Sequence, residues 1–140
     1  IRHVPGSGAA GGLGAGLLAF LDAELKRGVE IVLEAVRFQE RVKGASLVIT
    51  GEGRIDSQTI YGKTPIGVAK AAKQYGIPVI GIAGSLSEDS DIVLQHGIDA
   101  LYSIVPGVIP LTKAIQQAEY YLQQTARHIA RTIKISRNIY

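Results

Sequence analysis

Three short apolar runs, each closed by glycine, constrain the fold of this chain more than any other feature. They are SLVITG, PVIGIAG and ALYSIVPG, and each is typical of a strand buried on both faces. Between them lie TPIGVAKAAKQYG and EDSDIVLQHG, which have helical spacing and end at glycine. Strands that alternate with helices predict a parallel sheet, so we expect an α/β fold with three strands and flanking helices.

The size and composition of the chain fit one domain of a longer protein. A chain of 140 residues with 46% hydrophobic residues can bury a core of its own. The chain has no cysteine, which excludes a disulfide framework, a cysteine zinc site and a thiol nucleophile. Three parallel strands make a thin sheet with open edges, and the first residue is Ile1 rather than methionine. We therefore expect a segment whose partners lie elsewhere in a parent chain.

The charge pattern excludes two classes of partner. The net charge is +3, and beyond Glu119 the charged residues are all basic, namely Arg127, Arg131, Lys134 and Arg137. A nucleic-acid surface needs basic and aromatic residues interleaved over a face, and the body of the chain lacks this pattern. The longest uncharged apolar run, residues 9–21, is shorter than the ~18–20 residues that span a bilayer. We predict no nucleic-acid or membrane partner and a cytoplasmic location.

Three regions follow from the pattern of glycines and apolar residues. Residues 1–45 are predicted to be a glycine-rich loop and helical segment, residues 46–134 a βαβαβα unit, and residues 135–140 a tail. The first helix is expected to end at Gly28 after Lys26 and Arg27, with a stripe of Gly8, Gly12 and Gly16 where another backbone or a ligand approaches closely.

Two further helices are predicted. Residues 29–44 fit both a strand and a helix, and their length and polar residues favour a helix. The last helix is expected to start near Thr112 and to place six residues inward, namely Ile115, Ala118, Leu122, Thr125, Ile129 and Ile133.

The loop expected after the first strand, GEGRIDSQTIYGKT, carries most of the chemistry. If the strand ends at Thr50, these residues lie at the carboxyl end of a parallel sheet, where ligands bind. Arg54 offers a planar fork for a carboxylate or phosphate, and Asp56 can bind Mg²⁺ or take a proton. Lys63 then leads into a helix, with Thr64 as the expected N-cap and Pro65 at its first position. The alternative is a capped polar connection with Asp56 as a turn residue.

Two familiar motifs match only in part. The letters GKT do not follow a phosphate loop, because the required first glycine is replaced by Ser57. Gly6, Gly8 and Gly11 satisfy the dinucleotide pattern G-x-G-x-x-G, with Glu34 as the acid if residues 29–34 form a strand. This match supplies an alternative function, a segment of an NAD-dependent dehydrogenase.

The loop expected after the second strand is a weaker candidate, because its Gly84 and Ser85 can form an ordinary turn or touch a phosphate. Ser85 and Ser87 are expected to cap a helix that begins near Glu88.

Three segments, PGSGAAGGLG, LVITGEGRIDSQTIYGK and GVAKAAKQYGIPVIGIAG, stand in this order from Val4 onward. In order and spacing they strongly resemble the type I glycerate kinase family, over nearly the whole chain to about Ile133. The resemblance implies transfer of the ATP γ-phosphoryl group to a hydroxyl of D-glycerate, in a cleft between a Rossmann-like domain and a second α/β domain. That family's acidic, glycine-rich N-terminal motif has no counterpart here, so we expect the segment alone to be inactive.

Within this resemblance, the residues take specific roles. Asp56 is expected to act on the acceptor hydroxyl or on Mg²⁺, Arg54 to clamp the glycerate carboxylate, and Lys63 to bind phosphate. The further substrate and phosphate ligands are expected to be Gly6, Ser7, Gly8, Gly51, Glu52, Gly53, Gln58 and Thr64. ATP and Mg²⁺ are the expected cofactors, and the remainder of the parent chain or a second copy is the expected partner. A non-catalytic module that binds small anions is a further alternative.

Overall fold

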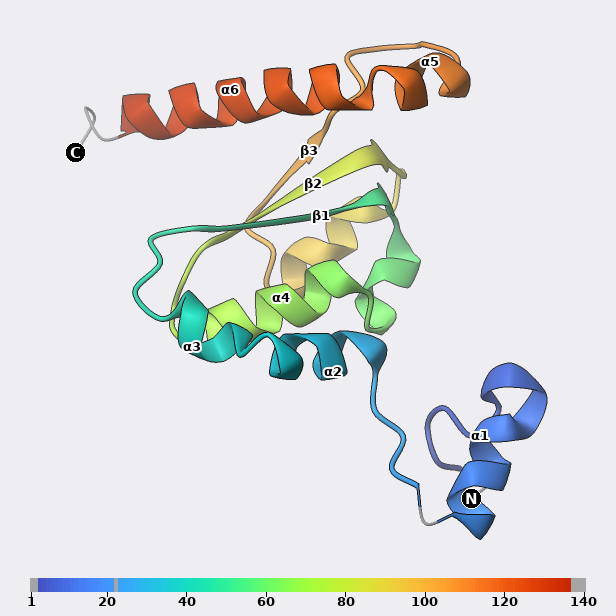
Figure 1. Ribbon diagram of the computed structural model, residues 1–140. Helices are drawn as coiled ribbons and strands as arrows, with labels where there is room; N and C mark the ends of the chain where they lie inside the picture. The colour runs from blue at the N-terminus through green and yellow to red at the C-terminus, as the bar shows by residue number, and fades with distance from the viewer. Residues whose placement is uncertain (1–2, 22, 137–140) are drawn as a thin grey trace.

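The computed structural model describes residues 3–21 and 23–136 and is built on one parallel sheet (Figure 1). The strands are β1 (Val48–Ile55), β2 (Val79–Leu86) and β3 (Ala100–Ser103), in the order β1-β2-β3. Val48 pairs with Val79 and Ile80 with Ala100, so β2 is the central strand. The predicted α/β class with a three-stranded parallel sheet is confirmed.

One face of the sheet carries the hydrophobic core. The helices α2 (Gly28–Ala35), α3 (Phe38–Val42) and α4 (Thr64–Lys73) lie on this side, with α4 nearest the strands (Figure 1). The short 3-10 helices η1 (Ser57–Tyr61) and η2 (Ser90–His96) follow β1 and β2. The largest fully buried aliphatic side chains of this core come from the sheet, from α4 and from η2 and its flank, namely Ile55, Ile66, Val79, Val93 and Ile98.

The helices α5 (Leu111–Gln116) and α6 (Ala118–Ser136) lie on the opposite side of the sheet (Figure 1). The prediction of a single helix from Thr112 is wrong, because the chain leaves helical geometry at Gln117. Of the six residues expected inward, Ile129 is buried, whereas Ile115 and Leu122 are 67% and 46% exposed. These two face an apolar groove that no described side chain fills. The tail residues 137–140 lie outside the described residues.

The first helix differs most from its prediction. The helix α1 (Ala9–Phe20) is interrupted by positive φ angles at Ala10, Gly11 and Gly12, and Gly28 begins α2 instead of ending the first helix. No atom of the described residues outside the local backbone lies within 4 Å of a Cβ built on Gly8, Gly12 or Gly16, so the stripe does not pack against another described backbone, and the approach of a ligand there stays a prediction. The tight position is Gly14, where a Cβ would lie 2.6 Å from the Gly6 carbonyl oxygen.

The strands β1 and β2 extend further than the sequence predicts. The expected end of the first strand at Thr50 is wrong, since Arg54 pairs with Ser85 and Ile55 with Leu86. Gly84 and Ser85 are therefore part of β2 rather than of a turn after it. The glycines allow the two strands to approach, because a Cβ on Gly84 would lie 2.5 Å from the Gly53 carbonyl oxygen.

Three smaller boundaries complete the comparison. Residues 29–34 are helical, as favoured, and Arg37 in the left-handed region separates α2 from α3. Lys63 rather than Thr64 is the N-cap of α4, because Thr64 already has helical geometry, and Pro65 lies in the first turn. The helix expected near Glu88 is the 3-10 turn η2, which starts at Ser90. None of the described helices is long and apolar enough to cross a membrane.

Candidate functional site

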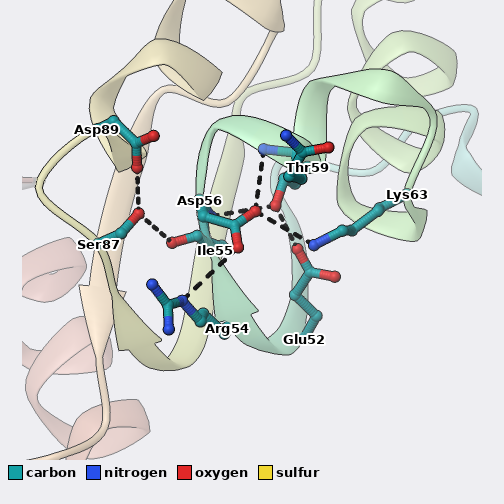
Figure 2. A network of polar contacts seen from close by, with 9 residues as sticks. Glu52, Arg54, Ile55, Asp56, Thr59, Lys63, Ser87 and Asp89 are labelled. Carbon is teal, nitrogen blue, oxygen red and sulfur yellow. Dashed lines mark hydrogen bonds and ion pairs between the residues drawn. The ribbon is translucent and has the colours of Figure 1, made fainter.

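Asp56 is the centre of a polar network at the carboxyl end of β1 (Figure 2). Its Oδ1 accepts hydrogen bonds from the Gln58 N–H at 3.0 Å and from Lys63 Nζ at 3.3 Å. Its Oδ2 lies 3.6 Å from Arg54 Nε. The structure therefore brings together the three side chains predicted to be catalytic, from β1, from the start of η1 and from the start of α4.

Local sequence rules explain this placement of Asp56. The residue has extended backbone geometry and caps η1, accepting from a backbone N–H while the Thr59 side chain accepts from the Asp56 N–H. Gly62, with φ of 101°, ends η1 in the left-handed conformation that glycine adopts without strain. This tight turn returns the chain to α4 and places Lys63 beside Asp56.

The exposure of the three side chains differs, and this decides what each can reach. The side chains of Asp56, Lys63 and Arg54 are 22%, 40% and 66% exposed. Within the described ranges, Arg54 has one ion pair, through Nε, so its terminal nitrogens are available for the bidentate contact that guanidinium makes with carboxylates and phosphates. Asp56 is the most enclosed of the three and carries a negative charge balanced by two cations.

Glu52 and Thr59 form a second part of the network. Thr59 is fully buried, and its hydroxyl donates a hydrogen bond of 2.7 Å to Glu52 Oε1. Sequence reasoning did not single out Thr59. The available signal was the pattern D-x-x-T over Asp56–Thr59, a capping box with threonine in place of the usual glutamate or glutamine.

The loop after β2 supports the loop after β1. The single proton of the Ser87 hydroxyl is shared between two acceptors, the Ile55 carbonyl oxygen at 3.2 Å and Asp89 Oδ1, which lies closer. Hydrogen bonds from the Ser57 and Ser87 hydroxyls lower the pKa of Asp89, because they stabilise the charged carboxylate. Ser87 therefore ties the end of β1 to the start of η2 and keeps the turn that carries Asp56 in place.

An apolar groove of about 900 Å³ opens beside the network. One wall is formed by the sheet and includes Gly51, Glu52 and Gly53 of β1 and Gly84 of β2, and the other includes Leu111, Ile115 and Leu122 of α5 and α6. A largely apolar groove with a few polar groups at its edge is typical of a small-molecule site. Glu52 belongs both to the groove wall and to the polar network.

The remaining predicted ligands are distributed unevenly. Gln58 contributes its backbone N–H to Asp56, and Thr64 is exposed at the start of α4. The turn at residues 6–8 packs against α1 through a hydrogen bond from the Ala15 N–H to the Ser7 carbonyl, 2.9 Å long. In Figure 1, α1 lies away from the sheet, so this turn is not brought to Asp56. The roles of Gly6, Ser7 and Gly8 stay predictions.

Comparisons with known proteins agree with the resemblance in the sequence. A model described as "Glycerate kinase family" matches residues 1–134. Glycerate kinase of Bacillus subtilis (strain 168) is 63% identical over 139 residues, covering 99% of this chain and 36% of its own. Glycerate 2-kinase of Escherichia coli (strain K12) is 54% identical over 135 residues, covering 96% of this chain and 35% of its own.

A solved structure gives the same result for the fold. The chain superposes on a crystal structure of a protein assigned as glycerate kinase 2 from Salmonella typhimurium LT2, with a TM-score of 0.72 and 50% sequence identity. That match covers 95% of this chain and 34% of the solved one. The chain thus spans about a third of the length of the relatives it matches.

Proposed function

This chain belongs to the glycerate kinase family, and from that premise we propose that the protein containing it transfers the γ-phosphoryl group of ATP to a hydroxyl of D-glycerate. The observation that carries the proposal is the cluster of Asp56, Lys63 and Arg54 beside the groove. Phosphoryl transfer needs positioning and charge neutralisation, together with a carboxylate that orients or deprotonates the acceptor. Lys63 and Arg54 supply the positive charge, and Asp56 supplies the carboxylate.

Each charged residue takes one role in this proposal. Asp56 accepts the proton of the glycerate hydroxyl or orients that hydroxyl for attack. The exposed guanidinium of Arg54 holds the glycerate carboxylate, and Lys63 contributes positive charge toward the phosphates. The backbone N–H groups at the start of α4 add to this positive potential.

The Asp56 carboxylate is the group of this site that fits a magnesium ion, the metal that kinases commonly use. Mg²⁺ commonly takes one or two protein carboxylates and completes its coordination with water and substrate phosphates. Holding the ion is the alternative to the role of Asp56 at the glycerate hydroxyl. The described residues contain no group of three or more acidic or histidine side chains that would form a closed metal cage. A bound Mg²⁺ would neutralise charge on the transferred phosphoryl group.

The two alternative functions are not supported. The dehydrogenase alternative requires a strand at residues 29–34, and these residues form α2. The relatives and the solved structure are named as kinases rather than as anion-binding modules.

The catalytic proposal is tested with the full-length protein and with residues 1–140, by ATP-dependent phosphorylation of D-glycerate. We expect turnover by the full-length protein, and NAD reduction without ATP turnover would contradict the proposal.

The rest of the longer polypeptide is the partner that we propose for this segment. Ile49 on the edge strand β1 is 53% exposed, and Leu111 and Ile115 are 74% and 67% exposed on the other side of the groove. Exposed apolar surface of this kind is normally covered. We therefore expect residues 1–140 alone to be inactive and to associate. A kinase assay of the isolated segment tests the first expectation, and sedimentation tests the second. Monomeric behaviour with parent-like turnover would contradict both.

A further inference from the structure

The carboxylate of Glu52 has an environment unlike that of Asp56. Asp56 is neutralised by Lys63 and Arg54, whereas no cation lies within 4.0 Å of Glu52 in the part of the chain that the structure describes. The hydrogen bond that Glu52 accepts from a side chain there comes from the Thr59 hydroxyl, at 2.7 Å on Oε1. A half-buried carboxylate with one neutral donor has lone pairs left to accept further hydrogen bonds.

The direction of the Thr59 hydroxyl is fixed by its two partners. Its oxygen accepts from the Asp56 N–H at 3.2 Å, and its single proton is donated to Glu52. The residue is fully buried, so water cannot replace either partner. Thr59 thus links two parts of the site. It connects the turn that carries Asp56 to Glu52, which lies seven residues before Thr59 on β1 and belongs to the groove wall.

A carboxylate without a cationic partner repels phosphate groups and attracts hydrogen-bond donors. Glu52 lines the groove beside Gly51 and Gly53, where the sequence predicts ligands of substrate or phosphate. A hydroxyl group is the donor that both substrates of the proposed reaction carry, on glycerate and on the ribose of ATP. Carboxylates accept such hydrogen bonds strongly.

We propose that Glu52 binds a substrate hydroxyl in the groove and that Thr59 is the positioning residue that holds its carboxylate for this contact. The inference rests on the proposed kinase function and adds to it a recognition element for hydroxyl groups. Of the two roles predicted for Glu52, substrate or phosphate binding, it favours the first, through a substrate hydroxyl. The Thr59 hydroxyl leaves one oxygen of Glu52 for the substrate.

The test measures kcat and KM for both substrates in the full-length protein. Glu52→Gln keeps the shape of the side chain and removes its charge, and Thr59→Val removes the hydroxyl at nearly constant volume. Both variants should raise the KM for the substrate whose hydroxyl is bound, by roughly tenfold, because Glu52→Gln removes the charge that strengthens the hydrogen bond and Thr59→Val removes the donor that positions the carboxylate. Thr59→Ser, which keeps the hydroxyl, should restore most of the affinity. Thr132→Val makes the same chemical change on the exposed face of α6 and should leave both KM values unchanged.

The choice of substrate separates the two sources of the hydroxyl. A rise in the KM for glycerate alone assigns the contact to the acceptor. A rise in the KM for ATP, with 2′- or 3′-deoxy-ATP no longer discriminated from ATP by the variant, assigns it to the ribose. Folding of each variant is checked by circular dichroism and thermal unfolding.

Two results would overturn the inference in different ways. If the wild-type protein phosphorylates glycerate and Glu52→Gln leaves both KM values unchanged, Glu52 does not bind a hydroxyl, even if kcat falls. Equal KM changes in Thr59→Val and Thr59→Ser would show that Thr59 acts through packing alone. If the wild-type protein does not phosphorylate glycerate, the proposed function fails and the inference fails with it.

Discussion

Lys63 Nζ lies 3.3 Å from Asp56 Oδ1, so the residue that caps α4 and the residue that caps η1 form an ion pair across one tight turn. The pair is partly exposed, and pairs of this kind contribute little to stability, about 0–1 kcal/mol. Its significance is therefore chemical. It places a carboxylate and an ammonium group side by side after the carboxyl end of β1, as the proposed phosphoryl transfer requires.

The first prediction concerns the charge of Asp56. In the full-length protein, Asp56→Asn keeps the shape and the capacity to cap η1, because asparagine caps helices about as well as aspartate. It removes the proton acceptor, so kcat for glycerate phosphorylation should fall by roughly 10²–10⁴-fold. The melting temperature should change little. A variant that melts early but keeps its specific activity per folded molecule would show that Asp56 is only a turn residue.

The second prediction concerns the fork geometry of Arg54. Its side chain is 66% exposed, and Arg54→Lys keeps the charge but loses the bidentate contact to a carboxylate. The KM for glycerate should rise with ATP affinity unchanged, because only the binding of the carboxylate is weakened. Steady-state kinetics with each substrate varied in turn measures this. An equal rise in the KM for ATP would place Arg54 on the phosphates instead.

Much of the fold follows from sequence patterns because the responsible interactions are local. Apolar runs bounded by glycine gave the three strands, and helical spacing gave α4. The ends of β1 and β2 were missed because glycine in a strand resembles a turn in sequence. The need for Gly84 depends on the Gly53 carbonyl, 31 residues earlier, which only the pairing of the strands brings close.

The candidate site was predictable in part for a similar reason. Three charged side chains close together in the sequence indicate a functional site, because an ordinary polar connection rarely needs them all, and the turn around η1 brings them into contact. They are Arg54, Asp56 and Lys63. Thr59 was missed because its role depends on complete burial and on a contact with Glu52, which lies in a different element. The groove also depends on α5 and α6 crossing the sheet, a long-range arrangement that periodicity does not encode.

The third prediction concerns the close approach of β1 and β2. A Cβ on Gly51 would strike the Ile82 carbonyl oxygen, whereas a Cβ on Gly53 would meet nothing within 4 Å among the described residues. Gly51→Ala should therefore destabilise the full-length protein by about 1–3 kcal/mol, the usual cost of overpacking. Gly53→Ala is the matched control for stability and should change the urea midpoint far less. Similar midpoints for the two variants would contradict this account of the strand pairing.

The last prediction concerns Asp99, which anchors the amino-terminal end of β2. Its Oδ2 lies 2.6 Å from the Val79 backbone nitrogen and 2.7 Å from Lys73 Nζ. Burial raises the pKa of Asp99, but the hydrogen bonds from Lys73 and Val79 outweigh it, and the net pKa is lowered. A lowered pKa means that the folded state favours the carboxylate, so this contribution to stability is present above the unfolded pKa of about 3.9 and is lost as the pH falls through the folded value.

Asp99→Ala in the full-length protein should cost about 1–3 kcal/mol at pH 7, since it leaves the Val79 N–H without its acceptor. The difference from wild type should narrow in urea unfolding below pH 4. Asp91→Ala, which removes an exposed carboxylate without an ion pair among the described residues, serves as the control, and a gap that stays constant or widens in acid would show that the charge of Asp99 is not what stabilises β2.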